Sequence, residues 1–145
     1  MFVVYPDADV PIVQLSLKRG LDPQAHLAAG RALASLRDEG ILIVGSGSSY
    51  HNLRMMGPEA KEPSAAFDAW LQQSLEGTDF DSRTAALASW ETAPSARVSH
   101  PREEHLLPLM VAVGAAEQDV ATRFYHENTF FGSGSVSSVM FSKSG

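Results

Sequence analysis

The chain has 145 residues, a length that fits one folded domain, so we expect a single domain over residues 1–145. Hydrophobic residues make up 44% of the chain and charged residues 19%, a globular balance that excludes a disordered or fibrous protein. The formal net charge of −6 argues against nucleic acid or an anionic membrane as a partner, because both bind clustered cations.

The sequence contains no cysteine, which excludes disulfides, thiolate zinc sites, iron–sulfur clusters and cysteine nucleophiles. The longest apolar runs, residues 41–44 and 106–113, are far shorter than the roughly 20 residues that a membrane span requires. The first residues carry no basic segment and no cleavage signal. We therefore expect a cytoplasmic protein.

The first part of the chain predicts a strand, a helix and a second strand. Residues 10–17 are mostly apolar and favour a strand, and Asp22-Pro23 is a helix-start signal. Gly40 is the expected left-handed cap of that helix. Residues 41–44 are all apolar, as in a strand covered on both faces of a parallel sheet. This order with short joints predicts a right-handed βαβ unit.

The second part predicts further helices and a hairpin. Apolar residues recur at helical spacing over 67–75, and Asp81 is expected to cap a shorter helix. Another helix is expected to be entered at residues 100–104 and to continue through 106–113, ended by Gly114 and kinked or delayed by Pro108. Strands over 123–126 and 136–141, joined by a Gly/Ser turn, favour an antiparallel hairpin. We therefore predict an α/β fold with a mostly parallel sheet and a C-terminal antiparallel hairpin.

The expected strand 41–44 runs directly into the glycine- and serine-rich loop 45–49. Loops at the carboxyl ends of buried parallel strands are where open α/β sheets place ligands. The loop lacks the dinucleotide fingerprint, the Walker lysine and the nucleophile-elbow spacing. A flexible turn leading to a site and an anion cradle made by backbone N–H groups both remain open.

Five histidines are the candidate chemical groups. His26 and His126 are best explained by ordinary structural positions. His51 follows the glycine-rich loop and could act as a general acid or base near neutral pH. His105 lies at the start of a predicted helix beside Glu104 and could bind a metal, but a signal of this kind is weak. His100 precedes a proline and is expected in a loop, because a helix could not place it on one face with His105.

Several segments, taken in order, resemble one family: residues 5–17, 30–33, 36–41, 45–54, 101–109 and 132–133. The most specific are Gly-Ser-Gly-Ser-Ser-Tyr-His-Asn-Leu-Arg around His51 and Pro-Arg-Glu-Glu-His-Leu-Leu-Pro-Leu around His105. The chain resembles the second half of the class III extradiol ring-cleavage dioxygenases, in particular the DOPA 4,5-dioxygenase-like branch.

The resemblance implies a three-layer α/β/α sandwich and the opening of a catechol ring with O2 at a non-haem metal, Fe(II) or Zn(II). It implies that His105 is a metal ligand and that His51 moves protons on the bound catechol and oxygen. Further ligand histidines of the family belong to a first half that has no counterpart here, and His51 and His105 alone cannot form the family's metal site. We therefore expect a homo-oligomer or a partner chain that supplies the N-terminal half.

Two rival functions follow from the same sequence. The first is a non-catalytic α/β binding or assembly module derived from the family, which would bind no iron. The second is a small-anion-binding or hydrolytic domain that uses the loop 45–49. Phosphates rather than catechols would then stabilise the protein against heat.

Overall fold

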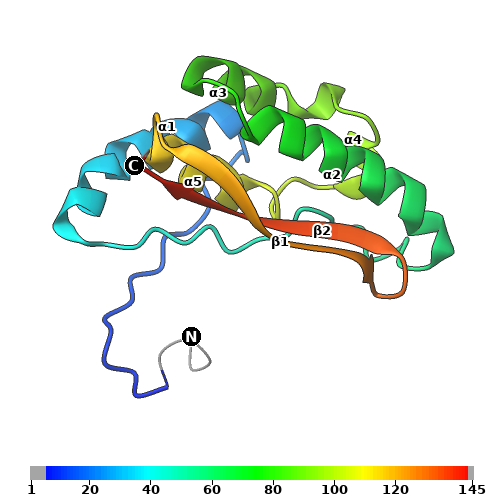
Figure 1. Cartoon of the computed structure of the whole chain (residues 1–145), viewed down its shortest axis with the longest axis horizontal. Helices are drawn as coiled ribbons and strands as arrows, with labels where there is room; N and C mark the ends of the chain where they lie inside the picture. Colours follow the sequence, from blue (N-terminus) through cyan, green and yellow to red (C-terminus); the bar gives the residue numbers. More distant parts are fainter. Residues whose placement is uncertain (1–5, 144–145) are drawn as a thin grey trace.

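The computed structural model describes residues 6–143. Residues 1–5, which form most of the N-terminal segment without a basic region or cleavage signal, lie outside the described part. Helices and a hairpin make up the regular structure, with the helices gathered along one side of the hairpin (Figure 1). In chain order the elements are α1 (Pro23–Leu33), η1 (Ala34–Glu39), η2 (Pro58–Ala60), α2 (Lys61–Leu75), α3 (Phe80–Ala88), η3 (Trp90–Thr92), α4 (Ala96–Ser99), α5 (Leu107–Ala116), β1 (Val120–Phe130) and β2 (Gly134–Ser142).

The first helix begins and its 3-10 extension ends at the predicted residues. The Asp22 carboxylate accepts hydrogen bonds from the backbone N–H groups of Gln24 and Ala25, and Pro23 occupies the first turn. The chain then tightens into η1 and leaves it at Gly40, whose φ of 81° is the left-handed conformation expected there. The Asp22 cap and the Gly40 turn each involve only neighbouring residues, so both can be predicted without knowledge of the tertiary structure.

The core forms around α5, which is apolar on all sides and packs against α1. The two helices cross at Gly30 and Gly114. A Cβ at Gly30 would stand 2.1 Å from the carbonyl oxygen of Val111, and one at Gly114 would stand 2.1 Å from that of Leu27. The largest fully buried core side chains come from α1, α2, α3, η3 and the segments before and within α5: Leu27, Phe67, Leu71, Leu75, Leu87, Trp90, Leu106, Leu107, Met110 and Val113.

Two helix boundaries differ from the predictions. The cap of α3 is Asp79 rather than Asp81, because the Asp79 carboxylate accepts from the backbone N–H of Ser82. The helix α5 starts late, with Pro108 in its first turn, and passes through Gly114 to end at Ala116. Gly114 therefore serves the close contact with α1 and does not end the helix.

The predicted antiparallel hairpin is present and is longer than expected. β1 pairs with β2 from Val120 opposite Ser142 to Phe130 opposite Gly134. The register shifts twice, between Arg123 and Tyr125 and again between Glu127 and Phe130. Such bulges re-aim the side chains that follow them.

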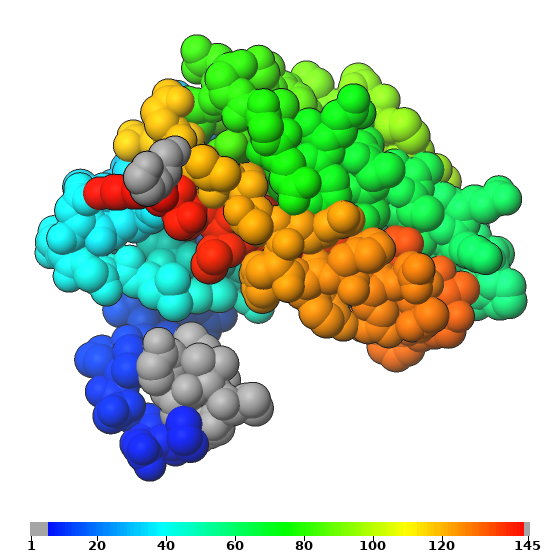
Figure 2. Space-filling model, viewed as in Figure 1, coloured from blue at the N-terminus to red at the C-terminus, as the bar shows by residue number. Residues whose placement is uncertain are grey.

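The predicted parallel sheet is not observed. Residues 10–17 and 41–44 form no strand, and the sheet of the described residues consists of β1 and β2 alone. Residues 6–17, dark blue in Figures 1 and 2, extend away from the body. A strand requires a neighbour to take up its backbone hydrogen bonds, and neither segment has one here. The described residues therefore do not form the predicted βαβ unit.

No helix among residues 6–143 has both the length and the apolar character needed to cross a membrane.

Candidate functional site: a stacked pair of imidazoles

The structure brings the two predicted site histidines into contact. The rings of His51 and His105 stack with their centroids 3.5 Å apart and their planes 22° from parallel. His51 comes from the loop before η2 and is half-buried, whereas His105 lies two residues before α5 and is exposed. The two rings thus lie together, while their chemical roles stay predictions.

Glycines let the loop approach the start of α5 closely enough for this contact. A Cβ at Gly47 would stand 2.2 Å from the carbonyl oxygen of His105, and one at Gly45 would stand 2.5 Å from that of Pro108. The backbone N–H of Ser48 donates to the same His105 carbonyl, at 2.9 Å. Close backbone approach therefore accounts for the glycines of the loop 45–49 without an anion.

A second set of hydrogen bonds ties the loop to the end of α4. The backbone N–H of His51 donates to the Ser99 carbonyl at 3.0 Å, and the Asn52 side-chain amide donates to the Val98 carbonyl at 2.7 Å. The His100 Nε2–H donates to the Ser49 carbonyl at 3.0 Å. Residues 49–52 are thus held by residues 98–100, which fixes the backbone that carries the His51 ring.

His100 is fully buried, and its ring packs edge-on against Phe67 and Trp90. Burial among apolar side chains lowers its pKa to about 4 from the usual 6.5, so the ring is neutral at neutral pH. Its Nδ1 has no hydrogen-bond partner among the described residues. The sequence predicts His100 in a loop and assigns it no role. No local sequence pattern indicates that a histidine before a proline packs against aromatic rings distant in the chain.

The pKa of His51 lies below its usual value, chiefly because the ring is partly withdrawn from water and next because the His105 ring lies beside it. The nearby Glu104 carboxylate acts in the opposite direction and favours the charged form. At neutral pH the His51 ring is therefore a neutral imidazole, which can accept a proton.

The remaining histidines lie outside this pair. His26 is expected at the surface or its boundary, but it is buried in α1, where its Nδ1–H donates to the Asp22 carbonyl and its Nε2 accepts from the Lys18 backbone N–H. His126 lies on β1 in a different groove, 3.5 Å from the Asp68 carboxylate.

His105 also lines an elongated groove of about 470 Å³ between segment 41–49, α5 and β2. The walls of this groove are mainly apolar residues of those three segments. Residues 6–143 contain no group of three histidine, aspartate or glutamate side chains placed to hold a metal ion. The donor groups of the described residues therefore do not by themselves make a metal centre.

The family model described as the catalytic LigB subunit of aromatic ring-opening dioxygenase matches residues 1–141. The chain belongs to the LigB family. This result confirms the family that the motifs around His51 and His105 predict.

Among LigB relatives, the chain is 39% identical over 132 residues to a protein of Beta vulgaris named 4,5-DOPA dioxygenase extradiol, covering 88% of this chain and 48% of that protein. It is 38% identical over 138 residues to the dioxygenase tasH of Hapsidospora irregularis, covering 86% of this chain and 42% of the relative. The chain thus spans about half the length of the curated LigB relatives it matches.

The LigB fold is also supported by a solved structure. An uncharacterised protein of Escherichia coli K12 superposes with a TM-score of 0.80 at 32% sequence identity, covering 95% of this chain and 58% of that one.

Proposed function

We propose that this LigB chain contributes to the extradiol cleavage of a catechol-type aromatic ring with O2. The observation that carries the proposal is the stacked contact of His51 and His105, the two histidines that the family motifs single out. Ring opening of this kind needs a metal position with sites free for substrate and O2, and a nearby group that moves protons. One exposed imidazole beside one neutral, half-buried imidazole supports that division of roles.

In this proposal His105 is one ligand of a non-haem Fe(II), or of Zn(II), and its exposed ring is free to take part. The metal, when bound, supplies the Lewis acidity and the open positions for catecholate and oxygen. His51 takes the proton of the catechol hydroxyl and returns it during ring opening, since its lowered pKa leaves it neutral before the reaction. Contact with the His105 ring keeps His51 within reach of a group held at the metal.

The remaining metal ligands must come from protein outside residues 6–143, because no third ligand lies in place there. The curated relatives are about twice as long as the matched region. We propose that a complementary polypeptide, equivalent to the part of those relatives that this chain does not match, supplies the ligands and also strands that pair with residues 10–17 and 41–44. The completed protein would then have the parallel sheet and the α/β/α layers expected of the family.

The test mixes the purified chain and Fe(II) with a polypeptide made from the unmatched part of the Beta vulgaris relative, and then adds DOPA. Oxygen uptake and a yellow ring-opened product are expected only with both polypeptides present. His105→Gln should prevent iron retention, measured by metal analysis. His51→Gln should retain iron and lower the turnover rate by roughly 10²- to 10⁴-fold.

Gln73→Ala, on the exposed face of α2, is the matched control and should behave as the unaltered chain. Equal loss of iron from the His51 and His105 variants would show that the roles are wrongly divided. A stable complex that binds no iron and consumes no oxygen with any catechol would favour the binding or assembly module instead.

A further inference from the structure

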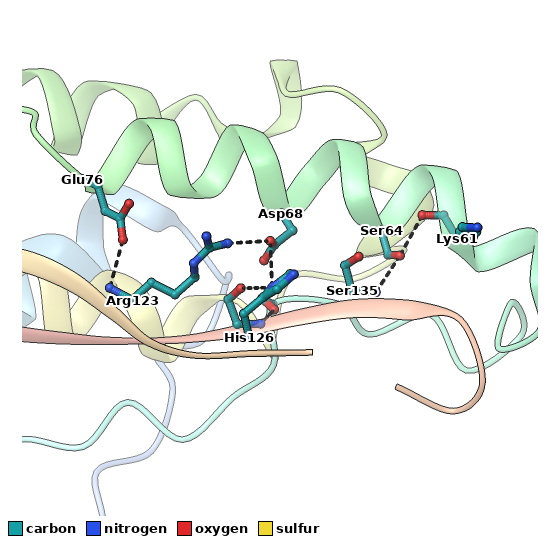
Figure 3. A network of polar contacts seen from close by, with 9 residues as sticks. Lys61, Ser64, Asp68, Glu76, Arg123, His126 and Ser135 are labelled. Atoms are coloured by element: carbon teal, nitrogen blue, oxygen red, sulfur yellow. Dashed lines mark hydrogen bonds and ion pairs between the residues drawn. The ribbon is translucent and has the colours of Figure 1, made fainter. Parts of the chain in front are cut away.

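A second groove, of about 650 Å³, lies between α2 and β1 and shares no lining residue with the groove that contains His105. Its helical wall consists of α2 residues that recur at helical spacing, including Asp68 and Gln72. Arg123 and His126 of β1 form the opposite wall (Figure 3). The volume is within the range of sites for small molecules.

The walls of this groove are fixed to each other at two places. The Ser64 hydroxyl of α2 accepts from the Ser135 backbone N–H at 2.8 Å, and the Glu76 carboxylate accepts from the Arg123 backbone N–H at 2.9 Å (Figure 3). Glu76 directly follows α2, so these bonds attach the hairpin near both ends of the helix. The groove is therefore a fixed feature between two tied elements, as a ligand site requires.

Three of the buried polar atoms that lack a partner belong to this helical wall. Asp68 is 4% exposed and Gln72 is 8% exposed. Asp68 Oδ1 and both polar atoms of the Gln72 amide make no hydrogen bond among residues 6–143. Buried polar atoms without partners are rare and costly, so three of them one helical turn apart indicate a polar occupant.

A bulge in β1 brings two side chains, Arg123 and His126, to Asp68. In a regular strand, residues 123 and 126 would point to opposite faces. The register shift between Arg123 and Tyr125 adds one residue and places both side chains on the same side. The Arg123 guanidinium lies 3.6 Å from the Asp68 carboxylate and the His126 Nδ1 lies 3.5 Å from it, as Figure 3 shows.

After these contacts, Arg123 and Asp68 still have hydrogen-bond donors and acceptors without partners among the described residues. The Arg123 guanidinium makes no hydrogen bond within the described part of the chain, so its donors are available to a carboxylate. Asp68 Oδ1 and the Gln72 carbonyl are acceptors that suit an ammonium group. An acceptor pair beside a guanidinium that keeps unused donors matches a molecule that carries both charges a few atoms apart.

We propose that the groove between α2 and β1 binds a small zwitterion, a free amino acid or a close derivative, through Arg123 on its carboxylate and Asp68 and Gln72 on its ammonium group. This site is independent of ring cleavage and of the His51–His105 pair.

The test measures thermal unfolding of the full chain with each common L-amino acid in turn, alongside the N-acetyl and methyl-ester forms of any that stabilise it. At least one free amino acid should raise the melting temperature with increasing concentration, and both blocked forms should fail to do so. Arg123→Gln and Asp68→Asn should each weaken binding at least about tenfold. The exposed Arg19→Gln and Asp81→Asn are the matched controls and should bind normally.

Because Asp68→Asn removes a buried charge and could affect folding, the side-chain amide resonances of Gln72 provide a second readout in the unaltered protein. They should shift on addition of the same amino acid, with the dissociation constant found by thermal unfolding. The proposal is overturned if no amino acid moves either signal. It is equally overturned if the blocked forms bind as well as the free ones.

Discussion

His100 is a basic side chain whose burial disfavours its positively charged, protonated form. Its pKa of about 4 in the folded chain lies below the usual 6.5, so the unfolded chain binds more protons between these values. The stability that its neutral form contributes is therefore complete above pH 6.5 and is lost as the pH falls toward 4. We expect the free energy of unfolding to fall over that window, by on the order of 3 kcal/mol from this residue.

Chemical denaturation at a series of pH values measures this loss. His100→Phe should flatten the slope between pH 6.5 and 4, because an aromatic ring of similar shape carries no proton. The variant also removes the donor to the Ser49 carbonyl. His100→Gln, which keeps an amide donor at a similar reach, separates the two effects. An unchanged slope in His100→Phe would contradict the assignment.

Gly47 sets how closely the two imidazoles approach. A methyl group there would stand 2.2 Å from the His105 carbonyl, which is backbone and cannot rotate away. We expect Gly47→Ala to push the loop outward and to abolish the nuclear Overhauser contacts between the His51 and His105 rings. Ser46→Ala, next to it and exposed, should keep them. Retained ring contacts in Gly47→Ala would show that the loop is not held by this approach.

At the scale of elements, α1 and α5 touch through their backbones at Gly30 and Gly114. A methyl group at Gly30 would meet the Val111 carbonyl and the backbone of α5, so Gly30→Ala must separate the helices. Overpacking of this kind costs roughly 1–3 kcal/mol, and we expect a loss of unfolding free energy of at least that size by denaturation. Ala28→Ser, on the exposed side of α1, should change it little. Equal stability of both variants would disprove the close crossing.

The elements that sequence predicts well are those whose causes are local. The Asp22 cap, the Gly40 left-handed turn and the hairpin each depend on a few neighbouring residues, and all three are present. The segments 10–17 and 41–44 have a strand composition but form no strand, because strand formation depends on a distant partner. The composition of a segment indicates that it could be a buried strand. It does not show whether another strand is present to pair with it.

The same distinction applies to the sites. His51 and His105 are found from sequence because family motifs surround them, and the structure brings them together. The aromatic cage of His100 joins residues more than thirty positions apart, and the Arg123 bulge depends on strand register. No periodicity in the sequence predicts the packing of His100 or the bulge at Arg123. The groove between α2 and β1 can therefore be recognised only from the structure.

At the scale of the whole molecule, the two segments that form no strand expose much apolar surface. The exposed fraction is 94% for Val13 and 72% for Leu42, and the neighbouring apolar residues are also exposed. Surface of this kind marks an interaction site or promotes association. We expect the isolated chain to self-associate as its concentration rises, as measured by light scattering after size-exclusion chromatography.

Val13→Ser combined with Leu42→Ser should shift the chain toward monomer without lowering its melting temperature, because both side chains are already in water. Replacement of two exposed polar residues, Gln73→Ala and Ser82→Ala, is the comparison. If the unaltered chain stays monomeric at high concentration, the predicted self-association is wrong.

The bonds that hold residues 48–52 join backbone to backbone, or side chain to backbone, entirely within this chain. The geometry of the two imidazoles consequently exists before any other polypeptide arrives. If a complementary polypeptide completes the site as proposed, it would meet a preformed pair of imidazoles and would lose conformational freedom only in its own ligands. It would then bind without any further ordering of residues 48–52.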